Sequence, residues 1–159
     1  MILNIIQILL IAAIIALLCK STNKGKLPME VQLPGGLPII TLTNNNKALN
    51  FIIDSGSNVS HICSNYFKDI NATLIDTPEE ATISGLGSVV SNIKMCEASF
   101  EDVMGKTYNV QLSISEELNE VAKSMEESTG VVIHGLLGTD FLKEYKCNIN
   151  FDSLEVYTK

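Results

Sequence analysis

Apolar residues in this chain form one long continuous run followed by many short ones. Residues 1–19 contain only Asn4 and Gln7 as polar side chains and carry no charged side chain. Beyond a polar stretch at 20–28, short apolar or β-branched segments alternate with Gly, Pro, Asn and Asp. Short segments with frequent turn signals are typical of an all-β, barrel-like domain.

The short segments predict strands joined by tight turns, with few helices. A helix is expected over 116–127, because Leu118, Val121, Ala122 and Met125 recur with helical spacing. Ser115 is its expected N-cap, and Gly130 its expected stop. Short helical turns are expected at 64–70 and 140–145, and a loop at 135–139. The expected strands cover 29–33, 39–43, 48–53, 81–83, 89–95, 98–104, 108–114, 131–133, 148–151 and 154–157.

The first 19 residues are long and apolar enough to predict a single transmembrane helix. A helix of that length would reach about 28 Å, close to the hydrocarbon thickness of a bilayer. The lysines at positions 20, 24 and 26 all follow this segment, so the following domain is expected to face the cytoplasm. We therefore expect an anchor at 1–19, a linker at 20–28 and a folded domain at 29–159.

Other interpretations of the apolar segment fit less well. A cleavable signal peptide would place a positive charge before the apolar run and small residues before the cut, and neither is present. A lipoprotein signal would use Cys19, but the large Leu18 precedes it. Lipidation of Cys19 would make the chain a lipid-anchored or secreted β-domain, which mass spectrometry of the mature N-terminus would detect.

Charge and cysteine usage argue against several classes of partner. The chain has 11 lysines, no arginine and 18 acidic residues, a net charge of −7. Phosphate backbones need a basic surface, so no nucleic-acid partner is expected. Four widely spaced cysteines suit buried thiols rather than a disulfide scaffold or a zinc ribbon. His61 with Cys63 lacks a second ligand cluster, so neither a metal nor another cofactor is expected.

The first candidate motif is an acid at the end of an apolar strand. The segment 51–57 reads Phe-Ile-Ile-Asp-Ser-Gly-Ser. A carboxylate at the end of a buried strand is costly unless it is hydrogen-bonded. Gly56 lets the chain turn and direct backbone N–H groups at Asp54, while Ser55 and Ser57 add hydroxyl donors. Taken alone, this pattern also fits a turn with a capping aspartate.

The second motif combines paired glycines with apolar residues. The segment 132–142 reads Val-Ile-His-Gly-Leu-Leu-Gly-Thr-Asp-Phe-Leu. The glycines flanking Leu136 and Leu137, at positions 135 and 138, allow close packing against a neighbouring loop. By itself this segment also fits a buried strand, turn and helix.

The two motifs, in this order and with a Gly-x-Gly hairpin between them, resemble the retropepsin-like aspartic proteases over about residues 29–158. The resemblance implies a closed β-barrel and a peptidase activity. It implies that Asp54 is catalytic and that Ser55, Gly56 and Ser57 support the active-site loop. It further implies a flap tip at Ser84, Gly85, Leu86 and Gly87, and a loop behind the active site at Gly135, Leu136, Leu137 and Gly138.

The chemistry of this family needs two carboxylates about one water. Two close carboxylates share a proton, so one can accept a proton from water while the other donates to the scissile carbonyl. This chain has a single Asp-Ser-Gly sequence. The second carboxylate is therefore expected from Asp54 of another copy, in a homodimer with a two-fold axis. Many family members pair an Arg with an acid at the places of Thr139 and Asn58, and that ion pair is absent here.

Two functions therefore stay open at the level of sequence. The first is a membrane-anchored, homodimeric aspartic endopeptidase that acts on peptides or proteins. The second is a catalytically silent module of the same fold that binds peptides or only dimerises. An unpaired acid at Asp54 favours the enzyme, because a binding module has no need for one.

Overall fold

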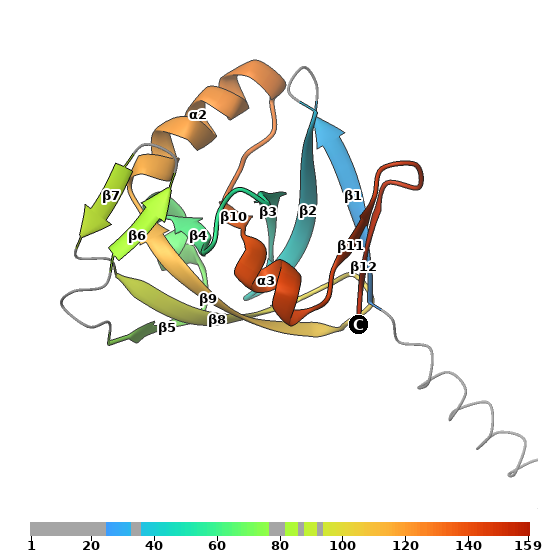
Figure 1. The fold of residues 1–159 in the computed structure, drawn as a ribbon, viewed down its shortest axis with the longest axis horizontal. Helices are drawn as coiled ribbons and strands as arrows, with labels where there is room; N and C mark the ends of the chain where they lie inside the picture. Colours follow the sequence, from blue (N-terminus) through green and yellow to red (C-terminus); the bar gives the residue numbers. More distant parts are fainter. Residues whose placement is uncertain (1–24, 33–35, 77–81, 86–87, 92–93) are drawn as a thin grey trace, which may run out of the picture.

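The computed structural model describes residues 25–32, 36–76, 82–85, 88–91 and 94–159. Within them the chain is mostly β-structure with few helices (Figure 1). The elements in chain order are β1 (Gly25–Gln32), β2 (Leu37–Asn44), β3 (Lys47–Ile53), β4 (Ser60–Cys63), η1 (Ser64–Asp69), β5 (Ala72–Ile75), β6 (Thr82–Gly85), β7 (Ser88–Ser91), β8 (Met95–Glu101), β9 (Thr107–Ser115), α2 (Glu117–Thr129), β10 (Gly135–Leu137), α3 (Thr139–Glu144), β11 (Asn148–Asn150) and β12 (Glu155–Thr158).

Six strands close into a barrel, in the order β2-β3-β10-β4-β9-β8, and β8 returns to β2 through the pair Thr43 and Glu101. The other strands, β1, β12 and β11, extend the sheet beside β2, and β5 extends it beside β8. β6 and β7 form a separate antiparallel hairpin. This arrangement confirms the prediction of an all-β barrel with short helices.

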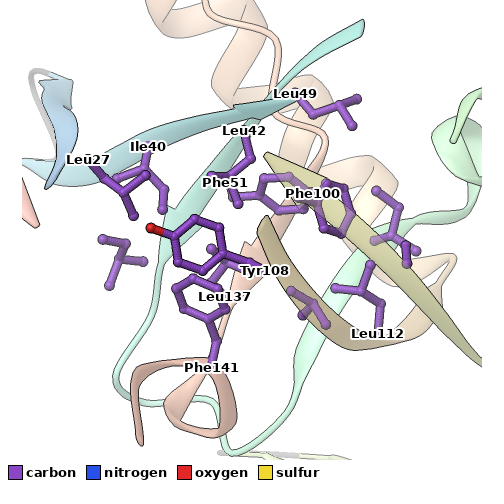
Figure 2. Close-up of a cluster of buried hydrophobic side chains, with 14 of the residues drawn as sticks. Leu27, Ile40, Leu42, Leu49, Phe51, Phe100, Tyr108, Leu112, Leu137 and Phe141 are labelled. Atoms are coloured by element: carbon purple, nitrogen blue, oxygen red, sulfur yellow. The ribbon is translucent and has the colours of Figure 1, made fainter. Parts of the chain in front are cut away.

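Alternating apolar residues on the barrel strands fill its interior. Phe51 and Phe100 meet edge to face with ring centroids 5.3 Å apart, and Tyr108 stacks at a tilt on Phe141 of α3. Figure 2 shows these rings between aliphatic side chains of β1, β2, β3, β9 and β10. The interior thus fixes the positions of β3 and β10, the strands that carry the two sequence motifs.

A second, smaller core lies between the outer face of the barrel and α2. Leu118 and Ala122 of α2 pack there with Ile52 and Cys63. The helix begins at Glu117 with Glu116 as its N-cap residue, one position after the expected cap, and the Ser115 hydroxyl accepts the Leu118 N–H at 3.1 Å. It ends at Gly130, which has a φ of 75° and donates its N–H to the Glu126 carbonyl. Val121, which was expected on the buried stripe, is exposed on the solvent side.

Several sequence-based boundaries differ from the structure. Residues 25–28 were expected in the linker, but they form the first half of β1 and pair with β12. Residues 102–104 were expected in a strand, but the Asp102 side chain accepts backbone N–H groups of the following residues and forms a turn. The expected anchor at 1–19 lies outside the described residues. No helix among the described residues is long and apolar enough to cross a membrane.

Candidate active site

Asp54 is the first residue after β3, and its backbone is tied to the neighbouring strand. Its N–H donates to the Leu137 carbonyl at 3.0 Å. Its side chain is half-buried, and the Oδ1 atom accepts the Gly56 N–H at 2.8 Å. The Ser57 N–H donates to the Asp54 carbonyl at 3.3 Å and closes the turn. The sequence Asp-Ser-Gly therefore turns back on its own carboxylate and leaves that group open to solvent on one side.

The second motif was expected to form a strand over 131–133 and then a loop, and this was wrong. Residues 131–134 form no ladder, while 135–137 form β10, which runs parallel to β3 and antiparallel to β4. The reason is steric. A Cβ at position 135 would overlap the His61 carbonyl oxygen and lie 2.8 Å from a ring carbon of Phe51. Only glycine lets the strand enter the gap between β3 and β4 at this point.

Gly138 brings the two motifs into contact. A Cβ there would lie 2.7 Å from the Val59 carbonyl oxygen and 2.9 Å from that of Ser57. The next residue, Thr139, donates its N–H to the Ser57 carbonyl at 2.8 Å. The Ser57 hydroxyl donates to the Val59 carbonyl at 2.7 Å. The loop that follows Asp54 is thus fixed by side-chain and backbone bonds, although Ser55 itself is exposed.

Asp140 and Ser60 form a clamp behind this loop that the sequence did not predict. Ser60 donates its N–H to Asp140 Oδ2 at 2.8 Å and its hydroxyl to Oδ1 at 2.7 Å. The Phe141 N–H also donates to Oδ1, and the Gly138 N–H donates to the Ser60 hydroxyl oxygen. The only sequence signal was an acid at the start of a helix that follows a glycine. Both oxygens of Asp140 are therefore engaged inside the fold.

The residues expected to form a flap lie at the end of β6 and between β6 and β7. Thr82 pairs with Ser91 and Gly85 with Ser88, so a hairpin flanks the Gly-x-Gly sequence as predicted. Ser84 and Gly85 are the last residues of β6. Leu86 and Gly87, the rest of the expected tip, lie outside the described residues.

The two histidines lie in different surroundings. His61 is on β4, and burial lowers the pKa of its imidazole although the charges of Asp140, Asp54 and Glu117 oppose that shift. Its buried Nδ1 finds no hydrogen-bond partner among the described residues. Burial also lowers the pKa of His134, whose Nδ1 accepts the Asn50 N–H at 3.0 Å. In the described part of the chain, no group of three or more His, Cys, Asp or Glu residues is placed to hold a metal ion.

The described cysteines are unreactive in character. Cys63, Cys96 and Cys147 are free thiols. Burial raises the pKa of each to about 11, which disfavours the nucleophilic thiolate. Among the described thiols and carboxylates around the two motifs, Asp54 is therefore the group best suited to chemistry.

The likeness to known proteins lies in the fold. No protein-family model matches the sequence, and no curated protein matches it. Among solved structures, the chain is similar to a retropepsin-like aspartic protease from Rickettsia conorii, with 18% sequence identity and a TM-score of 0.46. The match covers 84% of this chain and 90% of that one. At this level of likeness, function has to follow from the geometry around Asp54.

Proposed function

We propose that this protein is an aspartic endopeptidase in which Asp54 is the catalytic acid. The observation that carries the proposal is the position of this carboxylate. It stands at the end of a buried strand, accepts the Gly56 N–H, and is only half-buried. The loop that bears it is anchored to β10 through Leu137 and Thr139. A fixed and accessible carboxylate is suited to proton transfer with a bound water.

Two carboxylates are needed, and we propose that the second is Asp54 of another copy. With a shared proton, one carboxylate accepts a proton from the water as its oxygen attacks the carbonyl carbon, while the other protonates the carbonyl oxygen. Collapse of the tetrahedral intermediate breaks the C–N bond, and the amine leaves with a proton. Asp140 is a poor candidate for the second carboxylate, because Ser60 and Phe141 already occupy its oxygens. A two-fold dimer places identical loops face to face.

The substrate proposed is an extended peptide segment of a peptide or protein. The hairpin of β6 and β7 can cover a strand-like ligand, and backbone hydrogen bonds would hold it. Few charges lie in the two motifs, so apolar side chains are expected on both sides of the cleaved bond. Cleavage that maps mainly beside Lys residues would contradict this specificity.

The same proposal includes membrane attachment through residues 1–19, with the catalytic domain facing the cytoplasm. Its support is the uncharged apolar run and the lysines at positions 20, 24 and 26. The alternative function is a silent peptide-binding or dimerisation module. The position of the half-buried Asp54 carboxylate directly after a buried strand favours the enzyme.

The test is hydrolysis of a peptide library by the full chain in detergent or nanodiscs. Asp54→Asn should abolish hydrolysis, because the amide cannot accept the proton, and should leave thermal unfolding close to that of the parent. The matched control, Asp152→Asn, changes an exposed acid in the turn between β11 and β12 and should leave hydrolysis unchanged. Equal turnover by Asp54→Asn and the parent would refute the mechanism.

A mixing experiment tests the shared site. A tenfold excess of Asp54→Asn chains, reconstituted with parent chains into the same vesicles, should reduce the activity per parent chain by about tenfold, because most parent chains in a membrane-assembled dimer then pair with a mutant chain. Binding of peptides without any cleavage by the parent would favour the silent module. Cleavage that excess mutant leaves unchanged, with sedimentation showing a monomer, would refute the dimeric mechanism.

A further inference from the structure

The described chain starts in one corner of the fold, and that corner is fixed by close contacts. At Gly25, the first residue of β1, a Cβ would overlap the Thr158 hydroxyl and lie 2.6 Å from the Tyr108 hydroxyl. Lys106 donates to Thr158 and to the carbonyl of Lys159. In Figure 1 the start of β1, the chain's C-terminus and the turn between β8 and β9 lie together at this corner.

Only five residues separate this corner from the apolar run. Residues 20–24 can span at most about 18 Å even when fully extended. If residues 1–19 cross a bilayer, Gly25 must therefore lie close to the bilayer surface. In that case, this side of the domain faces lipid headgroups rather than bulk solvent.

The turn between β8 and β9 carries exposed apolar side chains at that corner. Val103 and Met104 are 72% and 79% exposed, the highest values among the exposed large apolar residues of the described chain. Hydrogen bonds to the side chain of the buried Asp102 fix the backbone of this turn. Its Oδ1 accepts the N–H groups of Met104 and Lys106, and its Oδ2 accepts the Tyr108 hydroxyl. The two apolar side chains are thus presented outward on a fixed backbone.

The same turn lies at the end of the barrel that is remote from Asp54. Glu101 pairs with Thr43, and Thr43 pairs with Ala48 near the start of β3. Asp54 follows six residues later along β3, which corresponds to about 20 Å at the usual rise of a strand. A bilayer that contacts the turn would therefore leave the Asp54 end of the barrel directed away from it.

We propose that Val103 and Met104 insert into the interfacial region of the bilayer that holds residues 1–19. Lipid is the partner of these two side chains, which together we call the apolar tip, because the short connection at 20–24 holds them next to the bilayer. The exposed Lys159 at the same corner carries a positive charge suited to anionic headgroups. The insertion gives the domain a second attachment point and a fixed orientation. This inference rests on the proposed anchor and is independent of peptide hydrolysis.

A tryptophan reporter tests the contact directly, since the natural chain contains no Trp. The full chain with Met104→Trp is reconstituted into vesicles of phosphatidylcholine and phosphatidylglycerol, with bromine on the upper acyl chain, at the depth of about 5–10 Å that interfacial side chains reach. We expect the emission to shift to shorter wavelength and to lose intensity relative to unbrominated vesicles. Flotation on a density gradient is measured on the same sample.

Leu74→Trp is the matched control. Leu74 is also an exposed apolar residue, at 61%, but it pairs with Cys96 at the other end of β8. Five residues, or about 17 Å, separate Cys96 from Glu101 along that strand. This reporter should show solvent-exposed emission and no quenching. Adding Val103→Asp to Met104→Trp should remove most of the quenching, because the charge opposes insertion.

The outcomes separate the two hypotheses. Flotation with Met104→Trp quenched more strongly than Leu74→Trp supports the inserted tip. Flotation with equal quenching of the two reporters overturns the insertion and leaves the anchor in place. Failure to float refutes the anchor, and the inserted tip is refuted with it. Hydrolysis is read in none of these measurements, so failure of the proposed catalysis is detected separately.

Discussion

The carboxylate of Asp140 should decide how firmly the loop that follows Asp54 is held. In Asp140→Ala, the N–H and the hydroxyl of Ser60 both lose their acceptor. Ser60 is completely buried, so its two donors are desolvated in the folded chain. An unsatisfied buried donor costs about 1–3 kcal/mol, and the Phe141 N–H loses a bond as well. We expect the free energy of unfolding to fall by about 3 kcal/mol.

Asp140→Asn should lower the free energy of unfolding by less than Asp140→Ala, but by a measurable amount. The amide keeps the shape of the side chain and one acceptor oxygen. In either orientation its NH₂ group replaces an oxygen that accepts a backbone N–H, from Ser60 on one side or from Phe141 on the other. One pair of donors then faces each other, and the expected loss is about 1–2 kcal/mol. The order of stability should therefore be Asp, Asn and then Ala.

Thermal unfolding followed by circular dichroism measures the effect. For a domain of this size, a loss of 1 kcal/mol lowers the Tm by about 3–4 °C, so Asp140→Ala should unfold about 10 °C below the parent. Asp152→Ala removes an exposed acid and should change the free energy of unfolding by less than about 0.5 kcal/mol. If Asp140→Ala unfolds at the same temperature as Asp152→Ala, the clamp does not stabilise the loop and the reasoning fails.

Two further predictions concern the strand behind the site and a half-buried histidine. Gly135→Ala should lower the free energy of unfolding by about 2–3 kcal/mol, since the added methyl group overlaps the backbone of His61; an unchanged Tm would contradict the close approach of β10. Burial lowers the pKa of His134 below its usual value of 6.5. As the pH falls below 6.5, the unfolded chain therefore binds a proton before the folded chain does. The free energy of unfolding should then drop by at most about 1.4 kcal/mol per pH unit. Urea unfolding between pH 8 and 5 should show a shallower pH dependence for His134→Gln than for the parent, and identical slopes would refute the assignment.

Four of the six barrel strands, β2, β3, β8 and β9, were predictable from the sequence because their signals are local. The short strands β4 and β5 were not among the expected ones. Apolar runs with β-branched residues ended at Asn, Gly or Asp, and the turns form at these positions. Asn45 and Asn46 adopt positive φ values of 51° and 59° between β2 and β3, which asparagine tolerates better than most residues. The hairpin of β11 and β12 and the helix ending at Gly130 followed from the same kind of signal.

The arrangement behind Asp54 was not predictable, because it depends on contacts between distant segments. Gly135 has a low strand propensity, yet it forms β10 because β3 and β4 leave a gap that only a residue without a side chain can enter. The Ser60 and Asp140 pair joins residues 80 positions apart. The turn at Asp102 was missed for a related reason. It forms because the Asp102 side chain accepts backbone N–H groups, and the hydrophobic pattern of the sequence does not reveal such bonds.

Membrane insertion of Val103 and Met104 would limit how two domains can meet to bring their Asp54 residues together. If Val103 and Met104 contact the bilayer, two anchored domains are confined to a layer with the same orientation, so their encounter requires rotation about one axis only. Tethering can raise the effective concentration to about the millimolar range. A dimer with a Kd of about 1 mM, worth about −4 kcal/mol, would then assemble at the membrane while remaining dissociated in dilute solution. Because Asp54 lies about 20 Å from the tip along the barrel, the substrate must reach that far from the bilayer surface. Soluble peptides and the extramembrane segments of other membrane proteins meet that condition, whereas a bond buried in the lipid does not.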